Sequence, residues 1–180
     1  FIQEDRSERQ YSFAQLGDCV AERSRQLLAS GLEKGDRIGM ILPNSYEFVV
    51  TFLACLETGI VAVPMFPPMS FGKLDGYLVT AARILKASGA KALVTEKRVE
   101  SILWSLVSQG SELADILCVE TLDATDGVAP NLEHIQLDDV AFLQFTSGST
   151  SVPKGVQVTH RSLIANLHGI MKYGLEIGPD

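Results

Sequence analysis

Hydrophobic residues follow two patterns along this chain: stripes with helical spacing and short continuous runs. Between Ser12 and Gly31 the apolar residues recur every three or four positions, which predicts a helix with one buried face. Ser12 and Gln15 have the spacing of a capping box, in which a hydroxyl and an amide each satisfy a free backbone N–H, so the helix should begin there. Gly31 can adopt the left-handed conformation that ends it. The expected buried stripe comprises Phe13, Leu16, Val20, Leu27 and Leu28.

Continuous apolar runs between the helical stripes predict buried strands. The first run, Arg37 to Leu42, stops at Pro43, and the spacing of Asn44 and Glu47 then predicts a second helix that Gly59 closes. The core side of that helix is expected to carry Phe48, Val49, Phe52, Leu53 and Leu56. The predicted strands are residues 37–42, 60–63, 92–95, 116–119, 140–145 and 156–158, and two further helices are predicted at residues 74–87 and 101–107.

The regular alternation of strands and helices indicates the fold class. Strands that are apolar on both faces and alternate with helices predict an α/β domain, with a largely parallel sheet flanked by helices on two sides. The segment Pro64 to Pro68 contains three prolines, which lack backbone donors, so it is predicted as an ordered loop outside the strand ladder. Trp104, at helical spacing with Leu103 and Val107, is predicted in the core.

The amino-acid composition indicates a protein with a substantial core and argues against nucleic-acid and membrane-spanning roles. The chain has 180 residues, 46% of them hydrophobic, which is enough to bury one substantial core. A net charge of -7 and a pI near 5.0 give no basic stripe for a nucleic-acid backbone, so no nucleic-acid partner is expected. No apolar stretch is long enough to span a bilayer, and the first residues lack the pattern of a signal peptide. A protein that is not transmembrane and a cytoplasmic location are therefore expected.

Cysteine and histidine spacing gives no sign of a metal site built by the protein. Cys19, Cys55 and Cys118 are widely spaced and each lies in an apolar segment, which is typical of small buried hydrophobes. The chain has no CxxC pair and no HExxH motif.

The segment that follows the predicted strand 140–145 is the candidate for chemistry. It reads Thr146, Ser147, Gly148, Ser149, Thr150, Ser151, Val152, Pro153, Lys154, Gly155. Its hydroxyls, its glycine and Lys154 could offer many donors and one positive charge to a polyphosphate. Open α/β sheets also bind their ligands at the carboxyl ends of strands.

Other interpretations of this segment are open from the residues alone. A cluster of Ser, Thr, Gly and Pro between two strands is also typical of a solvated turn. Neither the GxxxxGK[ST] loop nor the GxGxxG fingerprint is present. Ser151 to Lys154 matches the S-x-x-K motif of serine β-lactamases, but Pro153 is unsuited to the helix interior that this motif needs.

The segment from Phe145 to Gly155 resembles the phosphate-binding signature of the adenylate-forming superfamily, TSG[ST]TGxPKG. That superfamily includes acyl-CoA synthetases, the adenylation domains of peptide synthetases and luciferases. One position departs from the pattern, with Ser151 where the family usually has glycine. The stretches from Arg37 to Ser45, Gly59 to Pro68 and Val158 to Asn166 are similar to family segments as well, so the resemblance covers nearly the whole chain. The proline-rich stretch and Ser151 fit the fatty acyl-AMP ligases best.

The resemblance implies an acid-activating ligase that uses ATP and Mg²⁺ to convert a fatty acid into an acyl-adenylate for transfer to an acyl carrier protein. It implies that the β- and γ-phosphates are bound by Thr146, Ser147, Gly148, Ser149, Thr150 and Lys154. It also implies that residues 1–180 are the N-terminal part of the AMP-binding domain, with the C-terminal domain and its catalytic lysine absent, so that these residues alone should be inactive. No certain catalytic residue and no metal ligand is assigned within them.

Two alternative functions and one residue remain to be weighed. A fatty acyl-CoA synthetase would use coenzyme A as acceptor instead, and a non-catalytic module would bind an acyl chain or nucleotide without turnover. His160 has two interpretations, a general base or the start of the helix that follows Thr159. The second is preferred, because a carboxylate nucleophile is already ionised at neutral pH and needs no base.

Overall fold

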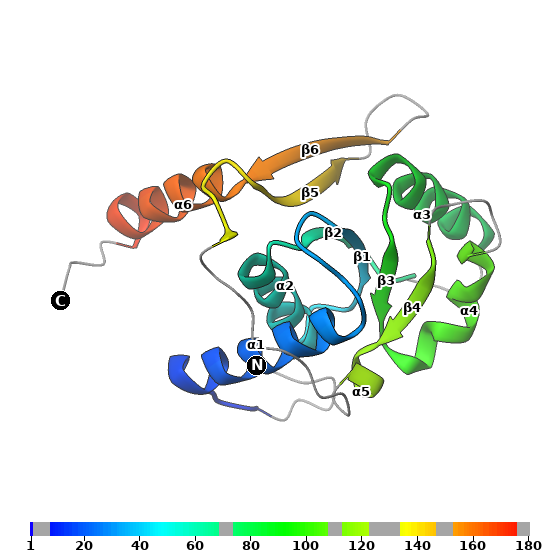
Figure 1. The fold of residues 1–180 in the computed structure, drawn as a ribbon, viewed down its shortest axis with the longest axis horizontal. Helices are drawn as coiled ribbons and strands as arrows, with labels where there is room; N and C mark the ends of the chain where they lie inside the picture. The colour runs from blue at the N-terminus through cyan, green and yellow to red at the C-terminus, as the bar shows by residue number, and fades with distance from the viewer. Residues whose placement is uncertain (2–7, 69–73, 108–112, 123–133, 147–152, 176–180) are drawn as a thin grey trace.

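The computed structural model describes residues 1, 8–68, 74–107, 113–122, 134–146 and 153–175 of the chain. Helices and strands alternate along these residues (Figure 1). The helices are α1 (Phe13–Ala29), α2 (Tyr46–Thr58), α3 (Leu74–Ser88), α4 (Lys97–Val107), α5 (Val119–Leu122) and α6 (His160–Gly169), which continues into a short π-helical turn, η3 (Ile170–Gly174). The strands are β1 (Arg37–Ile41), β2 (Val61–Met65), β3 (Ala92–Thr95), β4 (Asp115–Cys118), β5 (Val140–Thr146) and β6 (Lys154–Thr159).

The described strands form one sheet in the order β4-β3-β1-β2-β5-β6. Neighbouring strands from β4 to β5 pair in parallel, with Ile38 of β1 opposite Ala62 of β2 on one side and Ala92 of β3 on the other. The edge strand β6 runs antiparallel to β5. Strands β1 and β3 are almost continuously buried, as expected for parallel strands covered on both faces. The predicted fold class is therefore confirmed.

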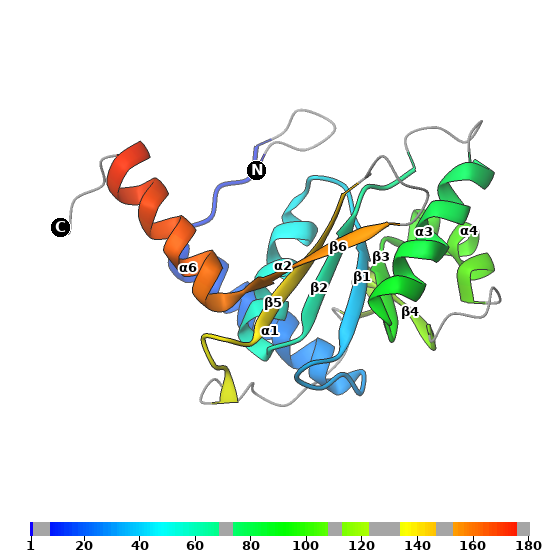
Figure 2. The same ribbon diagram turned by 90° about the horizontal axis from the view of Figure 1, so that it is seen from above.

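Helices cover both faces of the sheet, with α1 and α2 on one side and α3 and α4 on the other (Figures 1 and 2). Successive residues of a strand point to opposite faces. Ile38 and Met40 accordingly pack in the core beneath α1 and α2, whereas Ile41 packs in the core beneath α3 and α4. Val61, Val63 and Leu143 form a third, smaller cluster that continues the α3 side toward β5.

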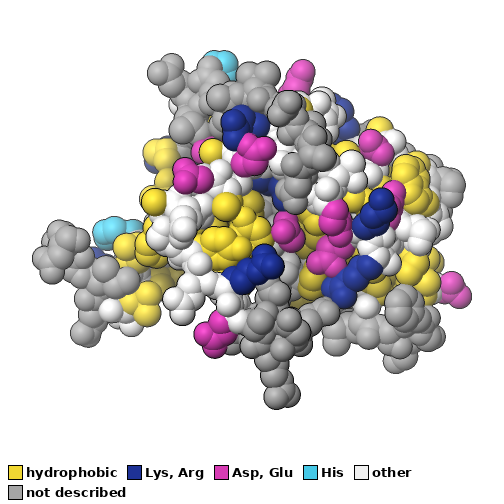
Figure 3. All heavy atoms as spheres, turned by 90° about the horizontal axis from the view of Figure 1, so that it is seen from below, with side chains coloured by type: hydrophobic (Ala, Val, Ile, Leu, Met, Phe, Trp, Pro, Cys, Tyr) yellow, Lys and Arg dark blue, Asp and Glu magenta, His cyan; other side chains and the backbone are white. Residues whose placement is uncertain are grey.

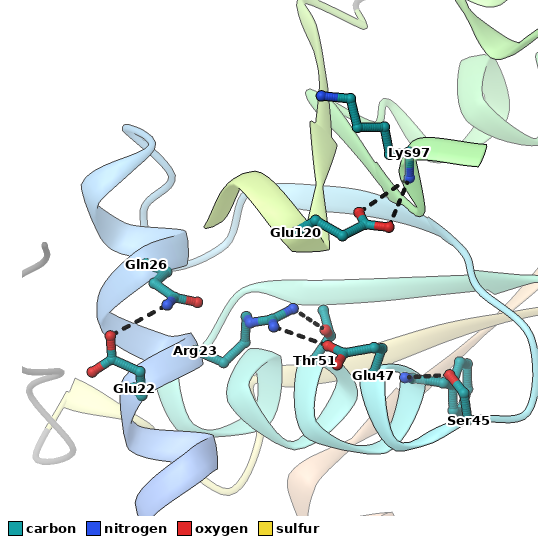
Figure 4. A network of polar contacts seen from close by, with 9 residues as sticks. Glu22, Arg23, Gln26, Ser45, Glu47, Thr51, Lys97 and Glu120 are labelled. Carbon is teal, nitrogen blue, oxygen red and sulfur yellow. Dashed lines mark hydrogen bonds and ion pairs between the residues drawn. The ribbon is translucent and has the colours of Figure 1, made fainter. Parts of the chain in front are cut away.

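A buried arginine specifies how α1 packs against α2 (Figure 4). The Arg23 side chain is only 3% exposed. It donates one hydrogen bond to the Thr51 hydroxyl at 3.0 Å and another to the Glu47 carboxylate at 2.9 Å. Burying a charge is costly unless the charge is paired and hydrogen-bonded, so other placements of α2 along α1 would lose these contacts at a cost.

The first two helices begin at capping residues, one of which was predicted correctly. Ser12 and Gln15 form the predicted capping box, with bonds of 2.8 Å and 3.2 Å. The predicted start of the second helix at Asn44 is wrong by one residue, because the Ser45 hydroxyl accepts the Phe48 N–H and caps α2. The buried residues of α2 are Val50, Thr51, Ala54, Cys55 and Thr58, whereas the predicted Phe48, Phe52 and Leu53 are only partly buried against the same core.

Three residues lie in surroundings that differ from the prediction. Phe13 is 94% exposed, because the first turn of α1 extends beyond α2 (Figure 1). Trp104 is 43% exposed, since it lies about a quarter-turn around α4 from the buried Leu103 and donates to Glu100 at 3.2 Å instead. Pro64 belongs to β2, opposite Met40 of β1, and not to a loop as predicted.

Charged side chains of both signs lie close to one another on the surface. On the face seen in Figure 3, acidic and basic side chains are interspersed around a hydrophobic area. Ion pairs among the described residues include Lys91 with Asp36 at 2.8 Å and Arg161 with Asp138 at 2.8 Å. Within the described residues, no helix combines the length and apolar character needed to cross a bilayer.

Among the described glycines, Gly39 in the middle of β1 leaves the least room for a Cβ atom, so it can be used to test the packing of the core. A Cβ atom there would lie 2.6 Å from Leu85, 2.8 Å from Leu93 and 3.0 Å from Met65, side chains of three different elements. We expect Gly39→Ala to lower the free energy of unfolding by about 1–3 kcal/mol through overpacking. Urea unfolding followed by circular dichroism would measure it.

The matched control is Gly17→Ala on the exposed face of α1, where an added Cβ meets nothing within 4 Å. Alanine should stabilise that helix by up to about 1 kcal/mol because of its higher helix propensity. If both substitutions shifted stability in the same direction, close packing at Gly39 would not be the cause.

Candidate functional site

Two of the predicted phosphate-binding residues face each other across the β5–β6 hairpin. Thr146 ends β5, Lys154 begins β6, and the antiparallel register places them opposite one another. Ser147, Gly148, Ser149 and Thr150 lie outside the described residues. The structure therefore fixes the two ends of the segment that carries them.

The hairpin presents this segment at the edge of the sheet where the parallel strands end. Strand β5 runs parallel to β2, so Thr146 lies on the same edge as Met65, the last residue of β2. Thr146 and Lys154 are both exposed, and the Lys154 side chain makes no hydrogen bond or ion pair with any other described residue. An exposed ammonium paired across the strands with a hydroxyl residue, at the carboxyl end of a strand, is suited to bind an anionic ligand.

The residues next to this pair lie on the opposite face of the hairpin. Phe145 is paired with Gly155, and its ring packs against the cluster of Val61, Val63 and Leu143. Beside the ring is a hollow of about 350 Å³ between the hairpin and the end of α3. Its lining combines apolar side chains with Arg37, Ser88 and Gln157.

The other end of the hairpin is held by a polar junction. The Lys34 ammonium contacts the Asp139 carboxylate at 2.6 Å and also donates to the carbonyl of His134. Backbone N–H groups of the first turn of α6 donate to the turn before β5, from His160 to the Asp139 carbonyl and from Arg161 to the Leu137 carbonyl. These two bonds satisfy helix donors that would otherwise lack partners. We call Lys34, Asp138, Asp139, His160 and Arg161 the hairpin junction.

His160 lies at this junction and not at the predicted phosphate-binding residues. Thr159 caps α6 by accepting the Ser162 N–H at 3.2 Å, and His160 is its first residue, so the preferred interpretation of His160 as a helix start is confirmed. Strand β6 separates His160 from Lys154. Burial lowers the pKa of His160, while Asp139 raises it and Lys34 lowers it further. The imidazole is therefore neutral at neutral pH.

The cysteines behave largely as predicted. Cys55 and Cys118 are buried, whereas Cys19 is partly exposed, and all three are free thiols. Burial raises the pKa of the Cys55 thiol to about 12, so it stays protonated and unreactive at neutral pH. In the part of the chain that the structure describes, no three His, Cys, Asp or Glu side chains are grouped so as to hold a metal ion.

A largely parallel sheet flanked by helices, with a hydroxyl-rich segment and a lysine at the carboxyl end of a strand, is an arrangement typical of α/β domains that bind phosphate groups. More specifically, the chain belongs to the AMP-binding enzyme family, whose model matches residues 1–180. The resemblance to adenylate-forming enzymes that the sequence predicted is thereby confirmed.

Individual relatives agree with this family. The medium-chain fatty-acid–CoA ligase of Escherichia coli is 30% identical over 87% of this chain and 29% of its own length. A structure from work on fatty acyl-adenylate ligases from E. coli and L. pneumophila superposes with a TM-score of 0.85, at 32% identity over 96% of this chain and 31% of that one. The L. pneumophila ligase in complex with acyl adenylate and pyrophosphate gives a TM-score of 0.75, at 26% identity over 94% and 29%. The chain thus spans less than a third of the length of these relatives.

We expect the charges at the hairpin junction to stabilise the fold in a pH-dependent way. The Lys34 ammonium, with help from the Gln136 N–H, lowers the pKa of Asp139 below its usual value of 3.8. A carboxyl with a depressed folded pKa stabilises the fold above its unfolded pKa, and that contribution is lost as the pH falls through the folded pKa. We expect Asp139→Asn to lower the urea midpoint at pH 7, and the difference from the native sequence to shrink below about pH 4.

Asp138→Asn is the matched control. Asp138 also has a lowered pKa, because of Arg161, but both partners of that pair are more than half exposed, so its effect should be smaller. Asparagine at position 139 keeps an oxygen that can accept the Gln136 N–H, which is 2.7 Å from the carboxylate. A deficit of Asp139→Asn that stayed constant from pH 7 to pH 3 would show that the charge is not its source.

Proposed function

We propose that this chain is the N-terminal part of the AMP-binding domain of a fatty acyl-AMP ligase, which uses ATP to convert a fatty acid into an acyl-adenylate for an acyl carrier protein. The observation that carries the proposal is the position of the exposed Lys154 opposite Thr146, at the two ends of a segment with the family signature; the Lys154 ammonium has no partner among the described residues. The similarity to fatty acyl-adenylate ligases supports this substrate class.

The proposal that the domain is larger than this chain has its own support. The chain spans less than a third of its relatives. Helix α6 has no buried residue, and Ile164, Leu167, Ile170 and Met171 are each about half exposed. Apolar side chains gathered on one helical segment are suited to pack against further parts of a domain.

The proposed reaction is a displacement at the α-phosphorus of ATP. An oxygen of the fatty-acid carboxylate attacks the α-phosphorus of ATP and forms a new oxygen–phosphorus bond. The bond from the α-phosphorus to the bridging oxygen breaks, and pyrophosphate leaves with the electron pair. Such displacements depend on positioning and charge neutralisation more than on covalent help from the protein.

In this proposal Lys154 neutralises charge on the β- and γ-phosphates, and Thr146 donates its hydroxyl. Ser147, Gly148, Ser149 and Thr150 supply further donors. Mg²⁺ accompanies ATP and shares the phosphate charge; because the described residues contain no metal-ligand cluster, no protein ligand is assigned to it. A cytoplasmic location stays a prediction from the sequence.

A second candidate differs only in the acceptor. The 30% identity to a fatty-acid–CoA ligase favours an acyl-CoA synthetase, in which coenzyme A takes the acyl group from the adenylate. Product analysis of the full-length protein with ATP, Mg²⁺, a panel of fatty acids and coenzyme A separates the two. Acyl-adenylate without acyl-CoA supports the carrier-protein ligase, acyl-CoA supports the synthetase, and neither product with any acid favours a binding module.

The role of Lys154 can be tested in the full-length protein. Lys154→Met should lower kcat/KM for ATP by about 10- to 100-fold, because a charged donor to phosphate is worth about 1.5–3 kcal/mol. The control is Lys91→Met, which removes an exposed lysine at the opposite edge of the sheet, where it pairs with Asp36. An ATP dependence that Lys154→Met left unchanged would exclude the segment from nucleotide binding.

A further inference from the structure

Phe145 occupies the space that a side chain at position 155 would need. The two residues are partners in the antiparallel register, one step from the pair formed by Thr146 and Lys154. A Cβ atom built on Gly155 would lie 2.8 Å from Cζ of the Phe145 ring, and 3.1 and 3.2 Å from its two Cε atoms. The ring therefore lies across the backbone of Gly155, and no larger residue fits there unless the ring moves.

The same ring connects the hairpin to the core. It packs against Val61, Val63 and Leu143, which belong to β2 and β5. In contrast, the first residues of β6, Lys154 to Gln157, are all exposed, and among the described strands β6 pairs with β5 alone. Besides the backbone pairing with β5, the contact with Phe145 thus connects the beginning of this edge strand to buried side chains.

The ring and the predicted phosphate-binding side chains lie on opposite faces of the hairpin. Phe142, on the α1 and α2 side, and Leu143, on the α3 side, set the alternation along β5. Continuing it, Phe145 points to the α3 side and Thr146 to the other. By the same alternation along β6, the Lys154 side chain points away from the face on which the Phe145 ring covers Gly155. The ring cannot touch a phosphate held by Lys154, so any influence on that ligand must pass through the backbone.

We propose that Phe145 is a positioning residue for nucleotide binding: by covering Gly155 it fixes the spacing and register of β6 at its first residues, and so the face on which Lys154 is presented. A slip of one residue in an antiparallel pair would turn Lys154 to the other face of the sheet. The inference rests on the proposed role of Lys154 in binding ATP and extends it to a residue that does not contact the ligand.

The test is a set of variants of the full-length protein: Gly155→Ala, Phe145→Leu, the double variant and Lys154→Met. Gly155→Ala should raise KM for ATP by about tenfold, because the new methyl group collides with the ring. Phe145→Leu should raise it severalfold, with KM for the fatty acid unchanged in both. In the double variant the smaller side chain makes room for the methyl group, so KM for ATP should return to the value of Phe145→Leu alone. Such compensation is expected only for groups in contact.

Each outcome has a distinct meaning. If Lys154→Met leaves KM for ATP unchanged, the proposed function of the segment fails, and this inference fails with it. If Lys154→Met weakens ATP binding but Phe145→Leu does not, only the positioning role fails. The positioning role would also be overturned if KM for ATP of the double variant rose by the product of the two single effects. Should Gly155→Ala not fold, the comparison of Phe145→Leu with the native protein still decides, because leucine leaves position 155 uncrowded.

Discussion

The pairing of β5 with a parallel strand on one side and an antiparallel strand on the other determines where the two ends of the signature segment lie. The parallel pairing with β2 directs the end of β5 to the carboxyl edge of the sheet. The antiparallel pairing with β6 returns the chain to the same point, so that Thr146 and Lys154 meet. A hydroxyl and an ammonium from opposite ends of one segment are thereby brought together by the pairing of the two strands, beside the contact of the Phe145 ring with Gly155.

Much of the fold could be predicted because the relevant forces are local in sequence. Apolar runs identified the described strands to within a few residues; for the inner parallel strands the reason is that a strand covered on both faces is mostly apolar. The capping box at Ser12 was also visible, because both of its partners lie in one turn. The errors came from choices that depend on three-dimensional context, such as Ser45 rather than Asn44 as a cap and the retention of Pro64 within β2.

The candidate site was likewise only partly predictable from the sequence. Its motif residues could be singled out because they are contiguous, but the groups that hold the hairpin could not. Lys34 donates to a carbonyl 100 residues away at His134, and no spacing rule relates the two positions. The same holds for Arg23, whose partners on α2 become visible only once the two helices are packed together. Contacts between distant segments depend on the topology of the sheet, which periodicity alone does not determine.

The exposed position of Trp104 has an optical consequence. It is the single tryptophan of the chain, it lies on α4, and strands β3, β1 and β2 separate that side of the sheet from β5. Its indole already faces water, so its fluorescence emission should be close to that of an unfolded chain and insensitive to a ligand bound at the hairpin. A fluorescent reporter of a ligand bound at the hairpin would therefore have to be introduced there, and replacing Trp104 by phenylalanine would remove the background at little structural cost.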